Sequence, residues 1–154
     1  MDIEEQYDKI YRFCYYRVRN KEIAEDLTQE TFLRFMNSRY EERGEVTRYL
    51  YTIARNLCIE ESRHIKTEEL PVSISDGGTI VEGMMDKILV EGALGKMAVE
   101  DRELLILRYL NEESVTDICE ITGISRFALY RRLNRAKKEF IKMMEGGKTH
   151  EQQN

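Results

Sequence analysis

Proline and cysteine are scarce in this sequence and tryptophan is absent. The scarcity of proline and of cysteine limits the structures that the chain can form. The single proline, Pro71, leaves long stretches in which no proline breaks a helix. The three cysteines are widely spaced and form no C-x-x-C pair, so neither disulfides nor a thiolate zinc site is expected. The longest apolar run, at 104–107, is far below the roughly 20 residues of a membrane span. Because the acidic start also lacks the apolar segment of a secretory signal, we expect a soluble cytoplasmic protein without membrane insertion.

Charge is abundant but unevenly distributed along the chain. Charged residues make up 34% of the 154 residues, and the formal net charge is -5. Residues 125–142, however, contain seven lysines and arginines against one glutamate, which leaves a net charge of -11 on the rest of the chain. A basic segment on an acidic body indicates two surfaces with different partners. The acidic total therefore does not exclude nucleic acid as one of them.

Apolar residues recur at helical spacing through most of the sequence, which predicts an all-α fold. Residues 1–65 contain three such stretches and are expected to form a three-helix bundle. The pattern lapses at 66–79, which contains the only proline and a glycine pair, and we interpret this segment as a flexible linker. Residues 80–145 are expected to form a second small helical domain, and 146–154 a disordered polar tail.

The second domain contains the spacing of a helix-turn-helix at 114–135. Ser114 and Ser125 are suitable N-caps for its two helices, and Gly123 lies where the turn needs a left-handed backbone. The second helix is apolar on its inward face and basic on its outward face, which suits the major groove of DNA. A solvated basic helix on a generic bundle is the simpler alternative, but the glycine turn and the charge asymmetry together favour DNA binding. The candidate DNA-binding residues are Ser125, Arg126, Phe127, Ala128, Tyr130, Arg131 and Arg135.

The third expected helix, from about residue 45 to 64, carries arginines, an amide and aromatic rings on its outer side. Rings stack on exposed bases, guanidinium groups bind phosphate and amides read base edges, so this composition suits a single-stranded nucleic acid. Alternatively, Tyr49 and Tyr51 only close the rim of the bundle. The candidate single-strand contacts are Arg48, Tyr49, Arg55, Asn56 and Arg63.

The second expected helix is acidic toward its N-terminal end. Acidic residues there most often form a solvated helix face with favourable placement near the helix dipole. A docking edge for a basic protein surface is the alternative. The residues concerned are Glu22, Glu25, Asp26, Gln29 and Glu30.

No set of residues typical of catalysis or of cofactor binding is apparent. Glu61 and His64 have the Glu-x-x-His spacing of di-iron bundles, but such a site needs a second copy and two further glutamates. The only other histidine, His150, has Gly147 three positions before it. The sequence also lacks a Gly-rich phosphate loop and a convincing Ser/His/Asp or Cys/His set. We therefore expect no enzyme activity, no metal, no cofactor and no small-molecule substrate.

Four segments, in order, resemble bacterial sigma factors of the extracytoplasmic-function (ECF) type, which belong to the sigma-70 family. Residues 25–33 resemble the helix by which the sigma-two domain grips the β′ subunit of RNA polymerase, and 49–57 the following helix, which handles the minus-ten promoter element. Residues 100–109 resemble the start of the sigma-four domain, and 117–136 its unit that reads the minus-thirty-five element. The sequence departs from the family at Tyr49, where tryptophan is usual, and at Phe127, in a slot that is usually small.

This resemblance implies a promoter-specificity subunit with no catalysis of its own. Its expected partners are the β′ and β subunits of core RNA polymerase, promoter DNA and an anti-sigma factor. In this family the anti-sigma factor is usually a membrane protein with a cytoplasmic sequestering domain. The resemblance places the polymerase contacts on the second helix, at Asp26, Gln29, Glu30, Phe32 and Leu33.

Two other functions remain open from the residues alone. A stand-alone helix-turn-helix regulator would use its first bundle to sense a ligand or to dimerise, and would bind a palindrome by itself. An interaction protein, such as a polymerase-binding antagonist, would act through the acidic bundle instead.

Overall fold

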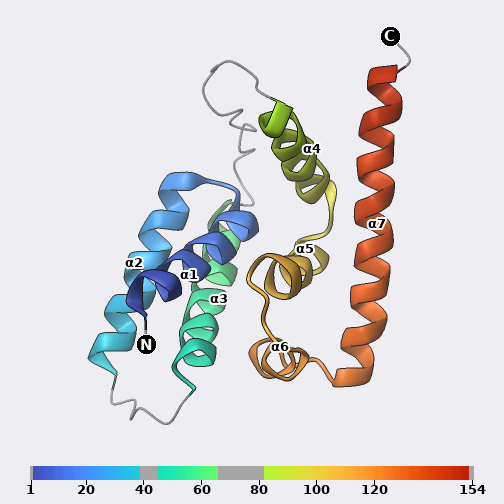
Figure 1. Cartoon of the computed structure of the whole chain (residues 1–154). Helices are drawn as coiled ribbons and strands as arrows, with labels where there is room; N and C mark the ends of the chain where they lie inside the picture. The colour runs from blue at the N-terminus through green and yellow to red at the C-terminus, as the bar shows by residue number, and fades with distance from the viewer. Residues whose placement is uncertain (1, 39–44, 66–81, 153–154) are drawn as a thin grey trace.

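The protein consists of two helical domains that pack side by side (Figure 1). The computed structural model describes residues 2–38, 45–65 and 82–152, and every regular element in these ranges is a helix. The N-terminal domain contains α1 (Ile3–Val18), α2 (Lys21–Asn37) and α3 (Val46–Ile65). The C-terminal domain contains α4 (Glu82–Lys96), α5 (Val99–Leu105), the π-helix η1 (Ile106–Leu110), α6 (Val115–Thr122) and α7 (Arg126–Gln152). This confirms the expected all-α fold, while residues 66–79, the predicted linker, lie outside the described residues.

Side-chain caps set the boundary between the first two helices. The Asp2 carboxylate accepts hydrogen bonds from the N–H groups of Glu4 and Glu5 at the start of α1. Arg19, with φ 56°, ends α1 in a left-handed conformation, and the Asn20 side chain then accepts the Ile23 N–H at 3.0 Å. These caps satisfy backbone groups that a helix end leaves unpaired, so the chain reverses within two residues.

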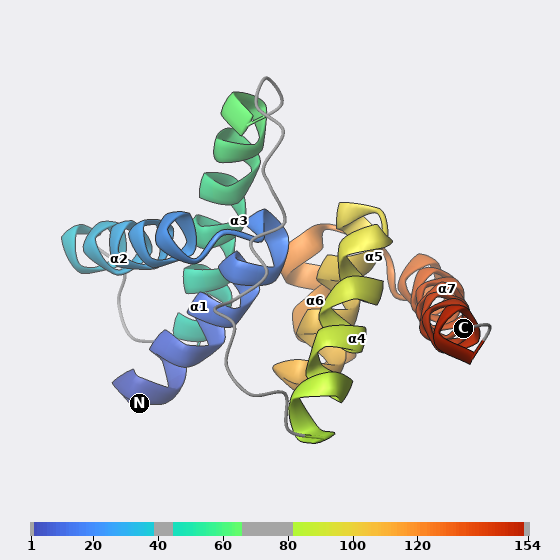
Figure 2. The same cartoon turned by 90° about the horizontal axis from the view of Figure 1, so that it is seen from above.

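The hydrophobic core is continuous between the two domains. Within the N-terminal domain, Ile10, Phe13 and Leu50 are almost completely buried between the three helices. The same cluster extends into the C-terminal domain through buried side chains of α5, η1, α6 and α7. The contacts that join the domains run from α1 to α5 and η1, and from α3 to α6. Figure 2 shows α7 on the far side of the C-terminal domain, away from α1–α3.

A π-helical turn divides the segment for which the sequence predicts a single helix over 100–110. In this turn the Asn111 N–H donates to the carbonyl of Ile106 at 2.9 Å, one residue beyond the α-helical partner. Glu112 follows with φ 55°, a left-handed backbone conformation. Together the two features direct the buried side chains of Asn111 and Glu113 toward the N-terminal domain.

The last helix is longer than the sequence suggests. The predicted helix ends near residue 144 and a disordered tail begins at 146, whereas α7 continues to Gln152. Residues 146–152 are therefore helical where the sequence predicts a polar, disordered tail. The glycine pair at 146–147 lowers helix propensity without ending the helix, because no proline follows and Lys, Glu and Gln are good helix formers.

We expect Gly123→Ala to lower the free energy of unfolding by about 1–2 kcal/mol, because a side chain is disfavoured at its φ of 78°. No atom outside the turn lies within 4 Å of the added methyl group, so the cost is that of the backbone conformation. Gly92→Ala is the matched control, since Gly92 is helical and its added methyl also meets no neighbour. It should stabilise the protein by about 0.5–1 kcal/mol. Urea unfolding followed by circular dichroism measures both, and an equal effect of the two substitutions would contradict this account of the turn.

Candidate nucleic-acid interface

The helix-turn-helix predicted from the sequence is formed by α6 and α7. The Ser114 hydroxyl accepts the Asp117 N–H at 3.1 Å, and the Ser125 hydroxyl accepts the Ala128 N–H at 3.2 Å. Gly123 ends α6 in the left-handed conformation that the spacing requires. Leu129 and Leu133 are buried on the inner face of α7. The helix therefore presents its opposite face to solvent, away from the N-terminal domain.

The exposed face of α7 is strongly basic and carries two aromatic rings. Phe127 is 76% exposed and Tyr130 is 54% exposed, although both are large apolar side chains. Ala128, the smallest of the predicted contacts, is half-buried. The exposed cations along the helix are Arg126, Arg131, Arg132, Arg135, Lys137, Lys138 and Lys142. A helix of this kind has the charge needed to bind DNA phosphates and side chains that can reach the base edges.

The candidate single-strand contacts on α3 do not form one exposed surface. Arg48 makes ion pairs with Glu45 of the same domain and with Asp117 and Glu120 of α6. Arg55 Nε lies 2.8 Å from Glu103 Oε1 of α5. The expectation that Arg48 and Arg55 face solvent is therefore wrong, because the C-terminal domain packs against this side of α3.

The remaining candidates on α3 are distributed over other surfaces. Asn56 and Arg63 are exposed, as the sequence predicts. The Tyr49 ring packs against Phe35 of α2, with 5.9 Å between ring centroids. Tyr51, which the alternative interpretation places at the rim of the bundle, is instead completely buried against Phe13.

A network of polar residues joins the two domains around Tyr51, and the sequence pattern marks none of the other members as a contact. The hydroxyl of Tyr51 accepts a hydrogen bond from Asn111 at 2.9 Å and donates one to Glu113 at 3.2 Å. Burial and the Glu113 carboxylate both raise the pKa of this tyrosine, so the hydroxyl stays protonated as a donor. Lys9 and Arg12 of α1 bind the same two partners, Lys9 to Glu113 at 3.0 Å and Arg12 to Asn111 at 2.9 Å.

Glu103 is the centre of a second, more deeply buried group at the domain boundary. Its side chain is 2% exposed and pairs with Arg17 at 3.0 Å and with Arg55 at 2.8 Å. The neighbouring Arg102 donates to the carbonyls of Leu94 and Arg17, at 3.2 and 3.0 Å. Burial, with the nearby Arg19 and Arg17, lowers the pKa of Arg102 to about 10. The sequence offers no pattern that marks Arg102 and Glu103 as buried, although both directly precede the apolar run 104–107.

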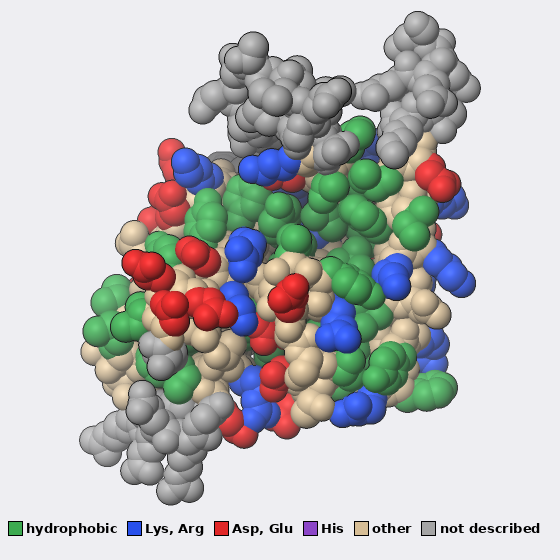
Figure 3. Space-filling view, in the orientation of Figure 1, with side chains coloured by type: hydrophobic (Ala, Val, Ile, Leu, Met, Phe, Trp, Pro, Cys, Tyr) green, Lys and Arg blue, Asp and Glu red, His purple; other side chains and the backbone are tan. Residues whose placement is uncertain are grey.

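One face of α2 combines polar and apolar exposed residues. Asp26, Gln29, Leu33 and Met36 follow one another at helical spacing, and Leu33 and Met36 are 55% and 75% exposed. Of the other predicted contacts, Glu30 is ion-paired with Arg34 at 2.9 Å, and Phe32 is half-buried against Tyr7. Figure 3 shows acidic side chains gathered over the α1–α2 side of the molecule.

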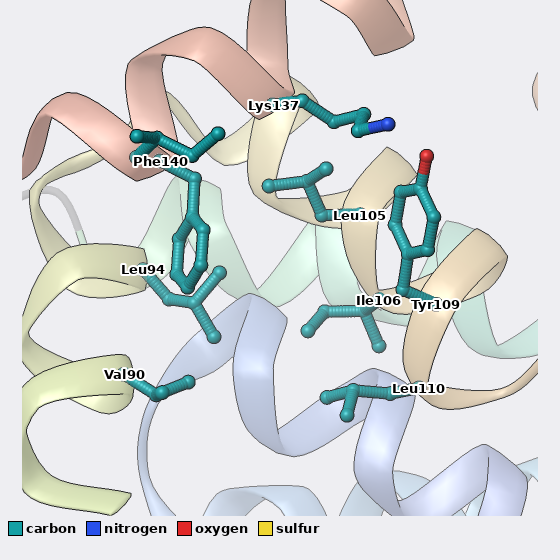
Figure 4. Close-up of a pocket in the computed structure, with 9 residues that line it drawn as sticks. Val90, Leu94, Leu105, Ile106, Tyr109, Leu110, Lys137 and Phe140 are labelled. Atoms are coloured by element: carbon teal, nitrogen blue, oxygen red, sulfur yellow. The ribbon is translucent and has the colours of Figure 1, made fainter. Parts of the chain in front are cut away.

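An apolar pocket of about 380 Å³ lies between α4, the end of α5, η1 and α7 (Figure 4). Its lining is almost entirely hydrophobic, and Lys137 lies at its edge with Nζ 5.4 Å from the centre of the Tyr109 ring. The remaining lining residues are Val90, Leu94, Leu105, Ile106, Leu110, Phe140 and Ile141. This pocket was not expected from the sequence, because its residues are spread over four helices, α4, α5, η1 and α7.

Neither a metal cluster nor a membrane span appears among the described residues. No group of three or more His, Cys, Asp or Glu side chains there is arranged to hold a metal ion. The side chain of His64, part of the Glu-x-x-His pair, lies outside the described residues. No helix in the described ranges has the length and apolar character that crossing a membrane requires.

Both domains match known protein families, and whole-chain relatives agree. Sigma-70 region 2 matches residues 3–67, and Sigma-70, region 4 matches residues 87–140. The ECF RNA polymerase sigma factor SigW of Bacillus subtilis is 29% identical over 157 residues, which cover 89% of this chain and 83% of SigW. The ECF RNA polymerase sigma factor BldN of Streptomyces coelicolor is 28% identical, and this chain spans 56% of its length.

A solved structure shares the arrangement of helices. It is the sigma factor RpoE of Bartonella quintana, determined in complex with the anti-sigma factor NepR. The TM-score is 0.71 at 19% sequence identity, with 91% of this chain and 92% of that chain covered. The ECF RNA polymerase sigma factor SigM of Bacillus subtilis is 30% identical over 153 residues, covering 90% of this chain and 92% of SigM. The chain therefore belongs to the ECF sigma factors of the sigma-70 family.

Proposed function

We propose that this protein is an alternative sigma factor that binds core RNA polymerase and directs initiation at specific promoters. The observation that carries the proposal is the ordered pair of sigma-70 regions 2 and 4, with an exposed basic helix in the second. The protein contributes binding surfaces, and the polymerase supplies the catalytic groups. Its place of action is the cytoplasm, where polymerase and promoter DNA meet.

The two domains bind different partners. Residues 1–65 form the sigma-two-like domain, which docks on the β′ subunit through the α2 face around Asp26, Gln29 and Leu33. Polar residues beside exposed apolar side chains suit this role, because apolar anchors provide most of the energy of a protein interface. Residues 80–145 form the sigma-four-like domain, which reads the upstream promoter box in the major groove through α7.

The minus-ten strand is held by α3 only after the domains separate. In the packed arrangement Arg48 and Arg55 pair with carboxylates of the C-terminal domain, so neither guanidinium is free to bind phosphate. Release from these carboxylates leaves both arginines free for the non-template strand, together with Tyr49, Asn56 and Arg63. The segment 66–79 connects the domains while each one contacts its own promoter box.

The protein partners are core polymerase and an anti-sigma factor. The β subunit is the second polymerase contact. The structural relative RpoE binds an anti-sigma factor, and a protein of that class is the inhibitor we propose for this chain. The pocket between α4, α5, η1 and α7 offers such a partner an apolar surface. DNA should compete little for this surface, because its lining carries a single charged side chain. The stand-alone regulator is not favoured, because the chain's relatives are ECF sigma factors.

Selection of promoters by the assembled enzyme tests the proposal. The full chain is mixed with core polymerase and a library of random duplexes, and the bound fraction is sequenced. The proposal expects enrichment of two short boxes at a fixed spacing, and none with polymerase or chain alone. Enrichment of a palindrome by the chain alone would instead support the stand-alone regulator.

A further inference from the structure

Several of the expected upstream-box contacts on α7 are held by groups of the C-terminal domain itself. The Ser125 hydroxyl is used as the N-cap of the helix, and Arg126 Nη2 donates to the Thr116 hydroxyl at 2.7 Å. Arg135 Nη2 lies 3.4 Å from Asp101 Oδ1. The exposed side chains at the start of the helix that none of these contacts holds include Phe127 and, one turn later, Arg131, with Tyr130 and Arg132 beside it.

Phe127 and Arg131 form a pair on the outer surface of α7. The Phe127 ring is 76% exposed, on the face opposite the buried Leu129 and Leu133, so it contributes little to the core. The Arg131 guanidinium lies over this ring, with Cζ 5.7 Å from the ring centre. Cation–π attraction holds the guanidinium beside the ring. The exposed aromatic therefore serves as a platform that positions the arginine.

The chemistry of the pair fits two particular bases. The 5-methyl group of thymine is the apolar group that base pairs present in the major groove, and a phenyl ring can pack against it. Arginine binds the O6 and N7 atoms of guanine with two hydrogen bonds, the commonest specific contact in this groove. Successive bases along one strand are about 3.4 Å apart, so a separation of 5.7 Å corresponds to one or two base steps.

We propose that Phe127 and Arg131 read a thymine and a guanine that lie one or two base steps apart in the upstream promoter box. This inference rests on the proposed function, because it assumes that α7 enters the major groove of promoter DNA. It specifies which bases of the upstream box the protein recognises. Phe127 determines specificity through the thymine methyl group, and Arg131 through the guanine edge.

Base analogues test the inference on the holoenzyme. The upstream box selected by the full chain with core polymerase is synthesised in three forms: unchanged, with deoxyuridine for thymine, and with 7-deazaguanine for guanine. Deoxyuridine lacks only the methyl group of thymine, so it should lower the affinity of the wild-type holoenzyme about fourfold. The loss of N7 should weaken binding by roughly tenfold.

Two variants show which side chain is responsible for each loss of affinity. Phe127→Ala should bind the thymine and deoxyuridine duplexes equally, and Arg131→Ala should not distinguish guanine from 7-deazaguanine. Lys138→Ala is the matched control, an exposed cation farther along α7 that should weaken binding to all three duplexes alike. Because Phe127 and Arg131 are exposed, both variants should keep the wild-type circular dichroism spectrum.

Two results would overturn the inference and leave the proposed function standing. One is a selected box with no thymine within two steps of a guanine. The other is a deoxyuridine duplex that the wild-type holoenzyme binds as tightly as the thymine duplex, or that lowers the affinity of the wild type and of Phe127→Ala by the same factor. Failure to select any box would instead overturn the proposed function itself, and the inference with it.

Discussion

Glu103→Gln is expected to separate the two domains without unfolding either of them. The substitution removes the negative charge that pairs with the buried Arg17 and with Arg55 across the domain boundary. Breaking a buried ion pair by removing one partner costs about 3–5 kcal/mol, because a charge is left buried without compensation. In the separated state both arginines return to water, so this cost applies to the packed state alone. The equilibrium should shift toward separation by a factor of about 10² to 5 × 10³.

Small-angle X-ray scattering measures the separation directly as a larger radius of gyration. Without polymerase, the same variant should also bind a single-stranded oligonucleotide more tightly than the wild type does. Arg55 no longer pairs with a carboxylate at position 103, and separation of the domains breaks the ion pairs of Arg48 with α6. Glu100→Gln is the matched control, an exposed glutamate on the same helix that should change neither property. An unchanged radius in Glu103→Gln, with an intact helical spectrum, would contradict the role given to Glu103.

Leu33→Asp combined with Met36→Asp is expected to abolish most of the affinity for core polymerase. The two side chains are 55% and 75% exposed on the α2 face, so replacing them costs little stability. As anchors of an interface they should each contribute about 2 kcal/mol, and their joint loss should raise the Kd at least a hundredfold.

Titration of labelled core polymerase with the variant measures this loss. Ile3→Asp is the control, because Ile3 is 65% exposed on α1 of the same domain, outside the proposed contact. It should bind polymerase as the wild type does. Equal affinities for the double variant and the wild type would place the polymerase contact elsewhere.

Helix positions and caps follow closely from the sequence, because each depends on local chemistry. Ser114, Gly123 and Ser125 each perform the role that their spacing predicts. The buried stripe of α7 also follows from its period, and with it the outward direction of Phe127 and Arg131. Local patterns of this kind can be read without knowing the rest of the fold.

The contact between the domains could not be predicted in the same way. Glu103 and Arg55 are charged, and a hydrophobic pattern assigns charged residues to solvent, although here they neutralise each other across a boundary. Tyr51 is buried because Asn111 and Glu113 satisfy its hydroxyl, and both lie some 60 residues farther along the chain. The π-turn that directs them has no periodic signal either. Long-range pairs between polar residues are therefore the part of this structure that one sequence does not reveal.

The most direct test of the account is to map transcription start sites on bacterial genomic DNA, using core polymerase with and without the purified chain. The account predicts a new set of start sites that require the chain, each preceded by the same two boxes. It further predicts that Arg131→Ala weakens initiation at these sites, while the variant still binds polymerase with wild-type affinity. Start sites that do not change when the chain is added would contradict the account, even if the chain were found to bind the polymerase.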